Sequence, residues 1–309
     1  MTTAPPLIVV AGPTATGKTG LAIELAEALA ATDRPVEIIS ADSRQVFRGL
    51  DIGTAKASAT DRARVPHHGL DLVDPDVSFS VADFATHVAG VLDDLGRRGG
   101  IAVLAGGTGL YLRAIAHGLD ADALPSDSEL RTRLEADLEE DGLESLVRRL
   151  SAIAPAFAAT VDLRNPRRVV RALEMAEIQG DRPRPTARGY PGPVAWLGLR
   201  IEAPTHQRLI AERARGQFEG GLLDEAQTLR QRFSPSLRAF SAFGYTEAWA
   251  VLDGAITREA AIELVVRRTN AFVKRQRTWF RSERQLVWYD ATERRPLDQM
   301  LAEIHRRIG

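Results

Sequence analysis

A glycine-rich segment near the start of the chain, residues 12–19, carries the residue types that bind phosphate. It matches the pattern G-x-x-x-x-G-K-S/T, follows the apolar run Leu7–Ala11 and precedes a helical pattern over residues 21–31. Strand, loop and helix are the order that such a motif needs, because backbone N–H groups and a helix N-terminus together attract anions. We therefore predict a diphosphate-binding loop, the phosphate loop, made of Gly12, Pro13, Thr14, Ala15, Thr16, Gly17, Lys18 and Thr19.

Two side chains of the phosphate loop have specific predicted tasks. Lys18 reaches an outer phosphate, and the Thr19 hydroxyl binds Mg²⁺, the one cofactor that we expect. Arginine is the default cation of this chain, since only Lys18, Lys56 and Lys274 are lysines among 40 basic residues. A lysine placed where a compact point charge is needed therefore supports the phosphate interpretation.

The strands that follow do not complete an ordinary P-loop nucleoside triphosphatase. Such enzymes hold Mg²⁺ with a second acid at the end of another strand. The best second strand, Ile101–Ala105, ends in the glycine-rich residues 106–109, which we call the Thr108 turn and which contain no acid. Asp42 follows the strand Val36–Ser40 instead. The phosphate loop is therefore predicted to serve a different reaction.

Asp42 and Thr108 are the side chains best placed for chemistry beside the phosphate loop. Both follow predicted parallel strands at their carboxyl ends, the edge where open α/β sheets bind ligands. A carboxylate there can accept a proton from an incoming nucleophile, with an Asx-turn as the structural alternative. The Thr108 hydroxyl can bind an anion oxygen, with a helix N-cap as its alternative.

Two clusters of basic residues suggest a large polyanion. Arg164, Arg167, Arg168 and Arg171 surround the start of a helix that Asn165 and Pro166 are expected to open, where positive side chains oppose the helix dipole. Phosphate between the helix N-terminus and the guanidiniums would remove that conflict.

A second basic cluster lies on the last long predicted helix, residues 258–284. Its charged stripe consists of Arg267, Lys274, Arg277, Arg281 and Arg284, with Phe272, Trp279 and Phe280 interleaved. Basic residues with interleaved aromatics are typical of nucleic-acid binders. A solvated arginine face is the alternative in both clusters.

Composition limits the class of protein. The chain has 309 residues, 44% hydrophobic content, a net charge of −1 and no cysteine, so disulfides and cysteine-bound zinc are excluded. No apolar run reaches the roughly 18 residues that span a bilayer, and the N-terminus lacks the regions of a signal peptide. We expect a cytoplasmic protein without a membrane partner. His67 and His68 are expected to be structural, because adjacent residues point in different directions and no third metal ligand is spaced to join them.

The elements alternate as in an α/β fold and then become helical. We predict a P-loop-type parallel sheet core flanked by helices, made of residues 1–118 and 194–309. A mostly helical inserted domain occupies residues 119–193, with Ser126 opening its first helix in a capping box and Gly180 ending its last.

These motifs, in order along nearly the whole chain, resemble the tRNA dimethylallyltransferase (tRNA isopentenyltransferase) family. The resemblance also rests on residues 42–47, 49–56, 66–68, 79–84, 165–173, 243–245 and 274–281. Departures are small: phenylalanine stands at positions 47 and 79 where tyrosine is common, and Phe243 replaces a smaller aliphatic residue. None of them removes a polar group that the predicted chemistry needs.

The resemblance implies transfer of a dimethylallyl group from dimethylallyl diphosphate to the 6-amino nitrogen of the adenine on the 3′ side of the tRNA anticodon. The phosphate loop then holds a diphosphate leaving group, and no ATP is hydrolysed. Asp42 and Thr108 are the implied catalytic residues, and Arg213 is a further implied contact to diphosphate. The residues implied to hold the anticodon stem-loop of tRNA are Asp42, Ser43, Arg44, Gln45, Thr108, Arg131, Pro166, Arg167, Arg168, Val169, Val170, Phe243, Gly244, Tyr245, Lys274, Arg277 and Arg281.

Three other functions remain open at this point, and the protein is expected to be a monomer. An adenine-nucleotide prenyltransferase would share the site, but the insertion and the basic helix favour a larger polyanion. A P-loop small-molecule kinase lacks the acid after Ile101–Ala105. A non-catalytic RNA-binding module that uses a nucleotide as a switch leaves Asp42 and Thr108 without a task.

Overall fold

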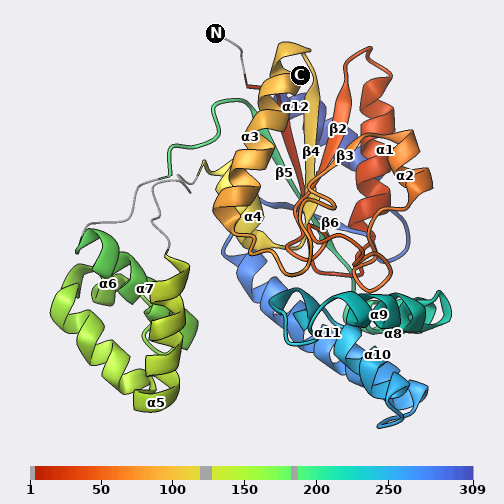
Figure 1. Cartoon of the computed structure of the whole chain (residues 1–309). Coiled ribbons are helices and arrows are strands. Elements are labelled where there is room, and N and C mark those ends of the chain that lie inside the picture. Colours follow the sequence, from red (N-terminus) through yellow and green to blue (C-terminus); the bar gives the residue numbers. More distant parts are fainter. Residues whose placement is uncertain (1–3, 119–126, 182–186, 309) are drawn as a thin grey trace. The chain divides into compact units, whose positions relative to one another are not determined.

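A parallel six-stranded sheet organises the part of the chain that the computed structural model describes, residues 4–118, 127–181 and 187–308 (Figure 1). The strands are β1 Leu7–Ala11, β2 Val36–Ser40, β3 His67–His68, β4 Ile101–Gly106, β5 Val194–Arg200 and β6 Val287–Asp290. Their order is β3-β2-β4-β1-β5-β6, and every neighbouring pair is parallel. All five residues of β1 are buried, as expected for a strand covered on both faces.

Alternation along the strands creates two separate cores. In β1, Leu7 and Val9 belong to one core and Ile8 and Val10 to the other. The flanking helices are α1 Lys18–Ala30, α2 Ala59–Arg64, α3 Val81–Arg97, α4 Gly109–Ala116, α8 Ala203–Glu219, α9 Leu222–Arg232, α10 Tyr245–Leu252, α11 Arg258–Arg281 and α12 Leu297–Ile308, with a 3₁₀ turn at Arg238–Ser241. Helices α1 and α12 pack on the second core, whereas α3, α4 and α8–α11 pack on the first.

The predicted fold class is confirmed, and the differences are local. Strand β4 extends one residue beyond its predicted end at Ala105. Strands β3 and β6 were not predicted, because two and four residues are too few for a periodic pattern. Helix α11 ends at Arg281, not at residue 284. Arg284, which we predicted to be part of the charged stripe, therefore lies beyond the end of the helix.

The segment between Gly118 and Gly189 forms a second compact unit. Its helices are α5 Ser128–Ile153, α6 Pro155–Thr160 and α7 Pro166–Gln179, which share their own apolar core. Asn165 caps α7 by accepting from Arg168 N, as predicted. The predicted capping by Ser126 is wrong in its residue: the side chain of Asp127 caps α5, and Ser126 lies outside the described residues.

Residues 189–193 lie with the sheet-containing unit, although we assigned them to the insertion. Gly189 N donates to His117 O at 2.9 Å, and the Tyr190 hydroxyl donates to Pro5 O at 2.7 Å. A run rich in glycine and proline reveals a loop but not its docking site, which depends on tertiary contacts.

Candidate active site

Two glycines shape the phosphate loop between β1 and α1. Gly12 has φ +155°, and a Cβ there would lie 2.8 Å from Leu199 O, so the turn needs glycine. Gly17, with φ +81°, directly precedes the first residue of α1. The Thr16 hydroxyl and the Lys18 ammonium both donate to Pro13 O, at 2.9 and 2.6 Å. Lys18 therefore folds back across the loop, while Thr19 is exposed on the first turn of the helix.

Thr14, in the middle of the phosphate loop, is held through all of its polar groups. Its N–H donates to Gln276 Oε1 at 2.9 Å, and its carbonyl accepts from His206 Nε2 at 2.8 Å. Its hydroxyl accepts from Arg213 at 3.3 Å. Side chains of α8 and α11 thus hold the phosphate loop in place. Because the Thr14 N–H is already bonded to Gln276, it is not free to bind an anion.

Lys18, Arg213 and Asp42 lie close enough for their charges to interact. Loss of hydration, together with the Arg213 guanidinium, lowers the pKa of Lys18 to about 7, and the Asp42 carboxylate partly opposes this. Burial lowers the pKa of Arg213 below its ordinary value as well, again opposed by Asp42. Two desolvated cations beside one carboxylate form a site that lacks negative charge, so a bound anion would relieve it.

The Asp42 segment, residues 42–45, leaves β2 at the same edge of the sheet. Asp42 Oδ1 accepts from Arg44 N at 2.8 Å, so the Asx-turn that we weighed is present. The turn uses one oxygen of a partly exposed carboxylate. Ser43 N donates to the Thr108 hydroxyl at 3.1 Å, which links the two predicted catalytic residues through one backbone position.

Thr108 is the N-cap residue of α4, as the alternative predicted, but its hydroxyl makes no capping hydrogen bond. It accepts from Ser43 N, which leaves its proton to donate elsewhere. The Thr108 N–H donates to Ala41 O at 3.2 Å and is therefore not part of the anion site that we expected from this turn. Close packing explains the glycines: a Cβ at Gly106 would lie 2.2 Å from Ala41 O, and one at Gly109 2.4 Å from the Trp279 ring.

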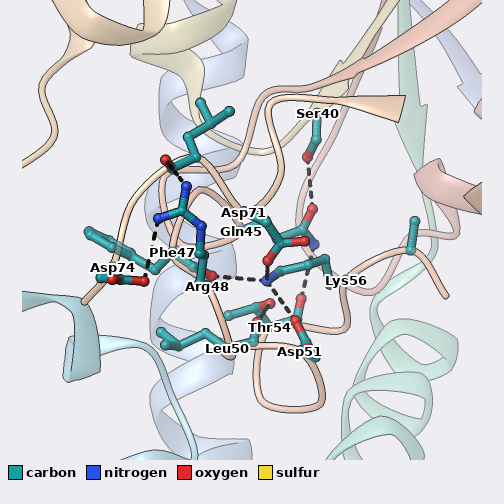
Figure 2. Close-up of polar contacts among 12 residues, drawn as sticks. Ser40, Gln45, Phe47, Arg48, Leu50, Asp51, Thr54, Lys56, Asp71 and Asp74 are labelled. Atoms are coloured by element: carbon teal, nitrogen blue, oxygen red, sulfur yellow. Dashed lines mark hydrogen bonds and ion pairs between the residues drawn. The ribbon is translucent and has the colours of Figure 1, made fainter. Parts of the chain in front are cut away.

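Internal hydrogen bonds occupy the amide of Gln45, which we predicted to bind tRNA. Its Oε1 accepts from the Ser40 hydroxyl at 2.7 Å, and its Nε2 donates to Thr54 O and Ala55 O at 3.1 and 3.3 Å. Figure 2 shows these contacts between the end of β2 and the loop that follows. In the free protein Gln45 therefore supports the Asp42 segment, and its contact with tRNA stays a prediction.

A buried lysine fastens the same loop from within. The Lys56 ammonium contacts Asp51 and Asp71 at 2.6 Å each and donates to Phe47 O at 2.9 Å (Figure 2). These partners satisfy a side chain that is 1% exposed, which accounts for a lysine in an arginine-rich chain. Lys56 thus has a structural task.

Glu225 of α9 completes the support of this loop. Its carboxylate accepts from the backbone N–H groups of residues 51, 52 and 53 at 3.1, 2.7 and 3.0 Å. It also accepts from the Tyr245 hydroxyl at 2.7 Å, and the Tyr245 side chain is fully buried. The Tyr245 hydroxyl and Gly244 N, which donates to Glu247, thus have partners inside the protein, and the contact of these two residues with tRNA stays a prediction. Phe243 remains partly exposed beside Arg268.

The stripe predicted on α11 is divided in the structure. Arg267, Lys274 and Arg281 are exposed. Arg277 turns inward, where it donates to Ile201 O at 3.2 Å and to His206 Nδ1 at 2.9 Å. In the free protein Arg277 thus supports the start of α8, a contact that helical spacing alone cannot reveal, and its contact with tRNA stays a prediction.

In the second unit, exposure separates the predicted residues. Pro166, Arg167 and Arg168 are exposed at the N-terminus of α7. The side chains of Val169 and Val170 are 0% and 4% exposed in the unit's apolar core, so a contact with tRNA at these positions would use the backbone, and it stays a prediction.

Arg131, also in the second unit, is one of three partners of a buried carboxylate. It pairs with Glu174 through two nitrogens at 2.9 Å. The Glu174 side chain is 0% exposed and also contacts Arg171 at 2.7 Å and Asp127 N at 2.9 Å. Arg131 is nevertheless 32% exposed, so part of its side chain still faces solvent.

Sequence reasoning missed Gln276 and His206, the two clamps on Thr14. Gln276 is 5% exposed and lies on the buried face of α11 with Val273 and Phe280. A lone amide at an apolar helical position was the available signal. His206 carried no such signal, since its partners come from the phosphate loop and α11.

Comparisons with known proteins agree over nearly the whole chain. A family model described as IPP transferase matches residues 45–283. The tRNA dimethylallyltransferase of Symbiobacterium thermophilum is 40% identical over 307 residues, covering 98% of this chain and 95% of that protein. The full-length tRNA isopentenylpyrophosphate transferase from Bacillus halodurans is 36% identical, with a TM-score of 0.69 and coverage of 97% of this chain and 95% of that one. A eukaryotic dimethylallyltransferase acting on tRNA shares the fold, with a TM-score of 0.73 at 23% identity, over 94% of this chain and 75% of that one.

Proposed function

The chain belongs to the IPP transferase family, and from that premise we propose that it is a tRNA dimethylallyltransferase. It transfers a dimethylallyl group from dimethylallyl diphosphate to the 6-amino nitrogen of the adenine next to the tRNA anticodon on its 3′ side. The second product is diphosphate.

One observation carries this proposal: two cations meet on the phosphate loop, where Lys18 donates to Pro13 O at 2.6 Å and Arg213 to the Thr14 hydroxyl at 3.3 Å, and the Asp42 charge acts on both. A kinase would need a second acid for Mg²⁺ at the end of the neighbouring strand. Strand β4, which lies between β1 and β2, ends in Gly106. The acid that does follow a strand is Asp42, after β2, and its charge acts on Lys18 and on Arg213, so it lies close enough to the phosphate loop to serve as the base.

The reaction moves one proton and breaks one carbon–oxygen bond. The adenine nitrogen attacks the first carbon of the allyl group, and the bonding electrons leave with diphosphate. Lys18, Arg213 and the loop N–H groups stabilise the negative charge that develops on the leaving oxygen. Asp42 accepts the proton that the amine loses, and the Thr108 hydroxyl donates to a diphosphate oxygen.

Mg²⁺ fits the donors that this chain offers. Among the described residues, no group of three or more histidines, cysteines and acids is arranged to hold a metal. Mg²⁺ commonly takes most of its ligands from substrate phosphates and water, so one hydroxyl is a sufficient protein contribution. Thr19, exposed on the first turn of α1, would supply that ligand. When bound, the ion adds positive charge that favours departure of the diphosphate.

Exposed basic residues in both units support a tRNA substrate. Lys274 and Arg281 lie on α11, and Arg167 and Arg168 stand at the start of α7 with helix N–H groups beside them. A stacked adenine must leave the anticodon loop to reach Asp42. In the described residues, no helix is both long and apolar enough to cross a bilayer. We propose that the protein acts on tRNA as a cytoplasmic monomer.

The test measures pyrophosphate release with Mg²⁺, dimethylallyl diphosphate and unmodified tRNA, and replaces the prenyl donor by ATP in a parallel reaction. Release that requires tRNA, with ATP inert, supports the proposal. A further reaction with adenosine monophosphate in place of tRNA distinguishes a tRNA-modifying enzyme from a free-nucleotide prenyltransferase. The latter would prenylate adenosine monophosphate equally well. Turnover of ATP without prenyl transfer would overturn the assignment in favour of a kinase.

A further inference from the structure

Gln276 joins two loops that leave neighbouring strands. Strands β1 and β4 are paired, with Ala11 opposite Gly106, so the phosphate loop and the Thr108 turn begin side by side. Gln276 comes from α11, 262 residues after Thr14, and its amide spans both loops. Its Oε1 accepts from Thr14 N and its Nε2 donates to Gly107 O, both at 2.9 Å.

An amide is the side chain that this place requires. Thr14 presents a backbone donor and Gly107 a backbone acceptor, so the bridging group must accept at one end and donate at the other. Asparagine and glutamine are the neutral side chains that do both from one rigid plane. At 5% exposure, a methionine would leave both backbone groups without their partner and a glutamate would face the Gly107 carbonyl with a second acceptor.

The surrounding residues are shaped to admit Gln276. A Cβ at position 107 would lie 2.5 Å from Gln276 Nε2, so glycine is needed there for the amide to approach. On the other side of Thr14, the His206 ring donates to the Thr14 carbonyl while its Nδ1 accepts from Arg277. Thr14 is thus held through its N–H from α11 and through its carbonyl from α8. Of Gln276 and His206, only Gln276 also contacts the Thr108 turn.

We propose that Gln276 is a positioning residue that sets the spacing between the phosphate loop and the Thr108 turn, and thereby the affinity for the diphosphate group. This inference rests on the proposed function for the identity of the ligand. Gln276 does not touch the reacting atoms. It acts through Thr14 and Gly107, which place the loop N–H groups on one side and the Thr108 hydroxyl on the other.

The experiment compares Gln276→Met and Gln276→Glu with Gln285→Met, a matched change at an exposed glutamine just beyond α11. The first readout is calorimetric binding of inorganic pyrophosphate in the presence of Mg²⁺, which needs no prenyl transfer. We expect Gln276→Met to weaken binding about tenfold or more, since it removes two buried hydrogen bonds, and Gln285→Met to change it less than about twofold.

Gln276→Glu supplies a signature that a purely structural role would not give. Its carboxyl, when protonated, again donates to Gly107 O and accepts from Thr14 N, and burial raises the pKa of such a group. Pyrophosphate affinity relative to wild type at the same pH should therefore recover as the pH falls from 8 to about 5.5. The ratio for Gln276→Met should stay constant over that range.

In the transfer reaction, the KM for dimethylallyl diphosphate should rise in Gln276→Met while the KM for tRNA stays the same. Binding of pyrophosphate by a folded Gln276→Met at wild-type affinity would overturn the inference. So would a pH-independent ratio for Gln276→Glu, which decides the matter if the methionine variant does not fold. If wild type binds pyrophosphate but transfers no prenyl group, the proposed function fails. The pyrophosphate affinities of the variants then still test the role of Gln276.

Discussion

Lys18 is expected to take up a proton when the diphosphate binds, and the amount follows from its pKa. In the free protein burial and Arg213 lower that pKa to about 7. At pH 8 about nine-tenths of the Lys18 side chains are then neutral, and at pH 6 about one-tenth. A bound diphosphate places negative charge beside the ammonium and returns its pKa toward the ordinary value of 10.5. Binding should therefore take up about 0.9 proton at pH 8 and about 0.1 at pH 6.

The same shift has an energetic consequence. Charging Lys18 at pH 8, one unit above its pKa, costs about 1.4 kcal/mol. The affinity of wild type at pH 8 is therefore about tenfold lower than with a lysine that is already charged. A variant without the amine avoids this proton uptake but also loses the charge that attracts the ligand.

Calorimetry in buffers of different ionisation heat measures the protons directly. Inorganic pyrophosphate with Mg²⁺ is titrated into wild type and Lys18→Met at pH 6 and pH 8. Subtracting the variant removes protons that belong to the ligand itself. The reasoning is refuted if the difference between the two proteins is the same at both pH values, since Lys18 would then not titrate in this range.

Three further outcomes test other parts of the site. Asp42→Asn keeps the Asx-turn acceptor for Arg44 but lowers the transfer rate at least about a hundredfold with unchanged tRNA affinity; a rate within about tenfold of wild type contradicts the base role. Replacing Arg167 and Arg168 together by alanine weakens tRNA binding and lowers the slope of log affinity against log salt by about one to two. An unchanged slope would mean that these arginines do not contact tRNA phosphates. Burial lowers the pKa of His206 below 6.5, so the folded protein binds that proton less readily than the unfolded chain; thermal stability is therefore lost as the pH falls below about 6.5, and thermal melts of His206→Asn should show a weaker loss between pH 7 and pH 5.

The elements that position the site were largely predictable because their signals are local. The five apolar residues of β1 and the glycines at positions 12 and 17 predict a strand, a turn and a helix without reference to the rest of the chain. Asn165 and Pro166 likewise define the start of α7 through contacts within one turn. The short strands β3 and β6 carry too few residues for a pattern, and they form by pairing with β2 and β5.

The roles of single side chains were less predictable, because a role depends on what packs against a helix face. Helical spacing placed Arg277 with Lys274 and Arg281, but Arg277 bonds to Ile201 O and to His206 of α8, whereas the other two are exposed. Tyr245 belonged to a matching motif, yet its hydroxyl is buried on Glu225.

The sequence by itself determined the phosphate loop, the strand-end position of Asp42 and the order of the elements, since each follows from residues adjacent in the chain. Only the tertiary structure decided that Thr14 is gripped by His206 and Gln276 and that Lys18 shares a desolvated site with Arg213. These partners lie about two hundred residues or more beyond the loop in the sequence. Their hydrogen bonds and charges exist only once the parallel sheet has brought α8 and α11 to the ends of its strands.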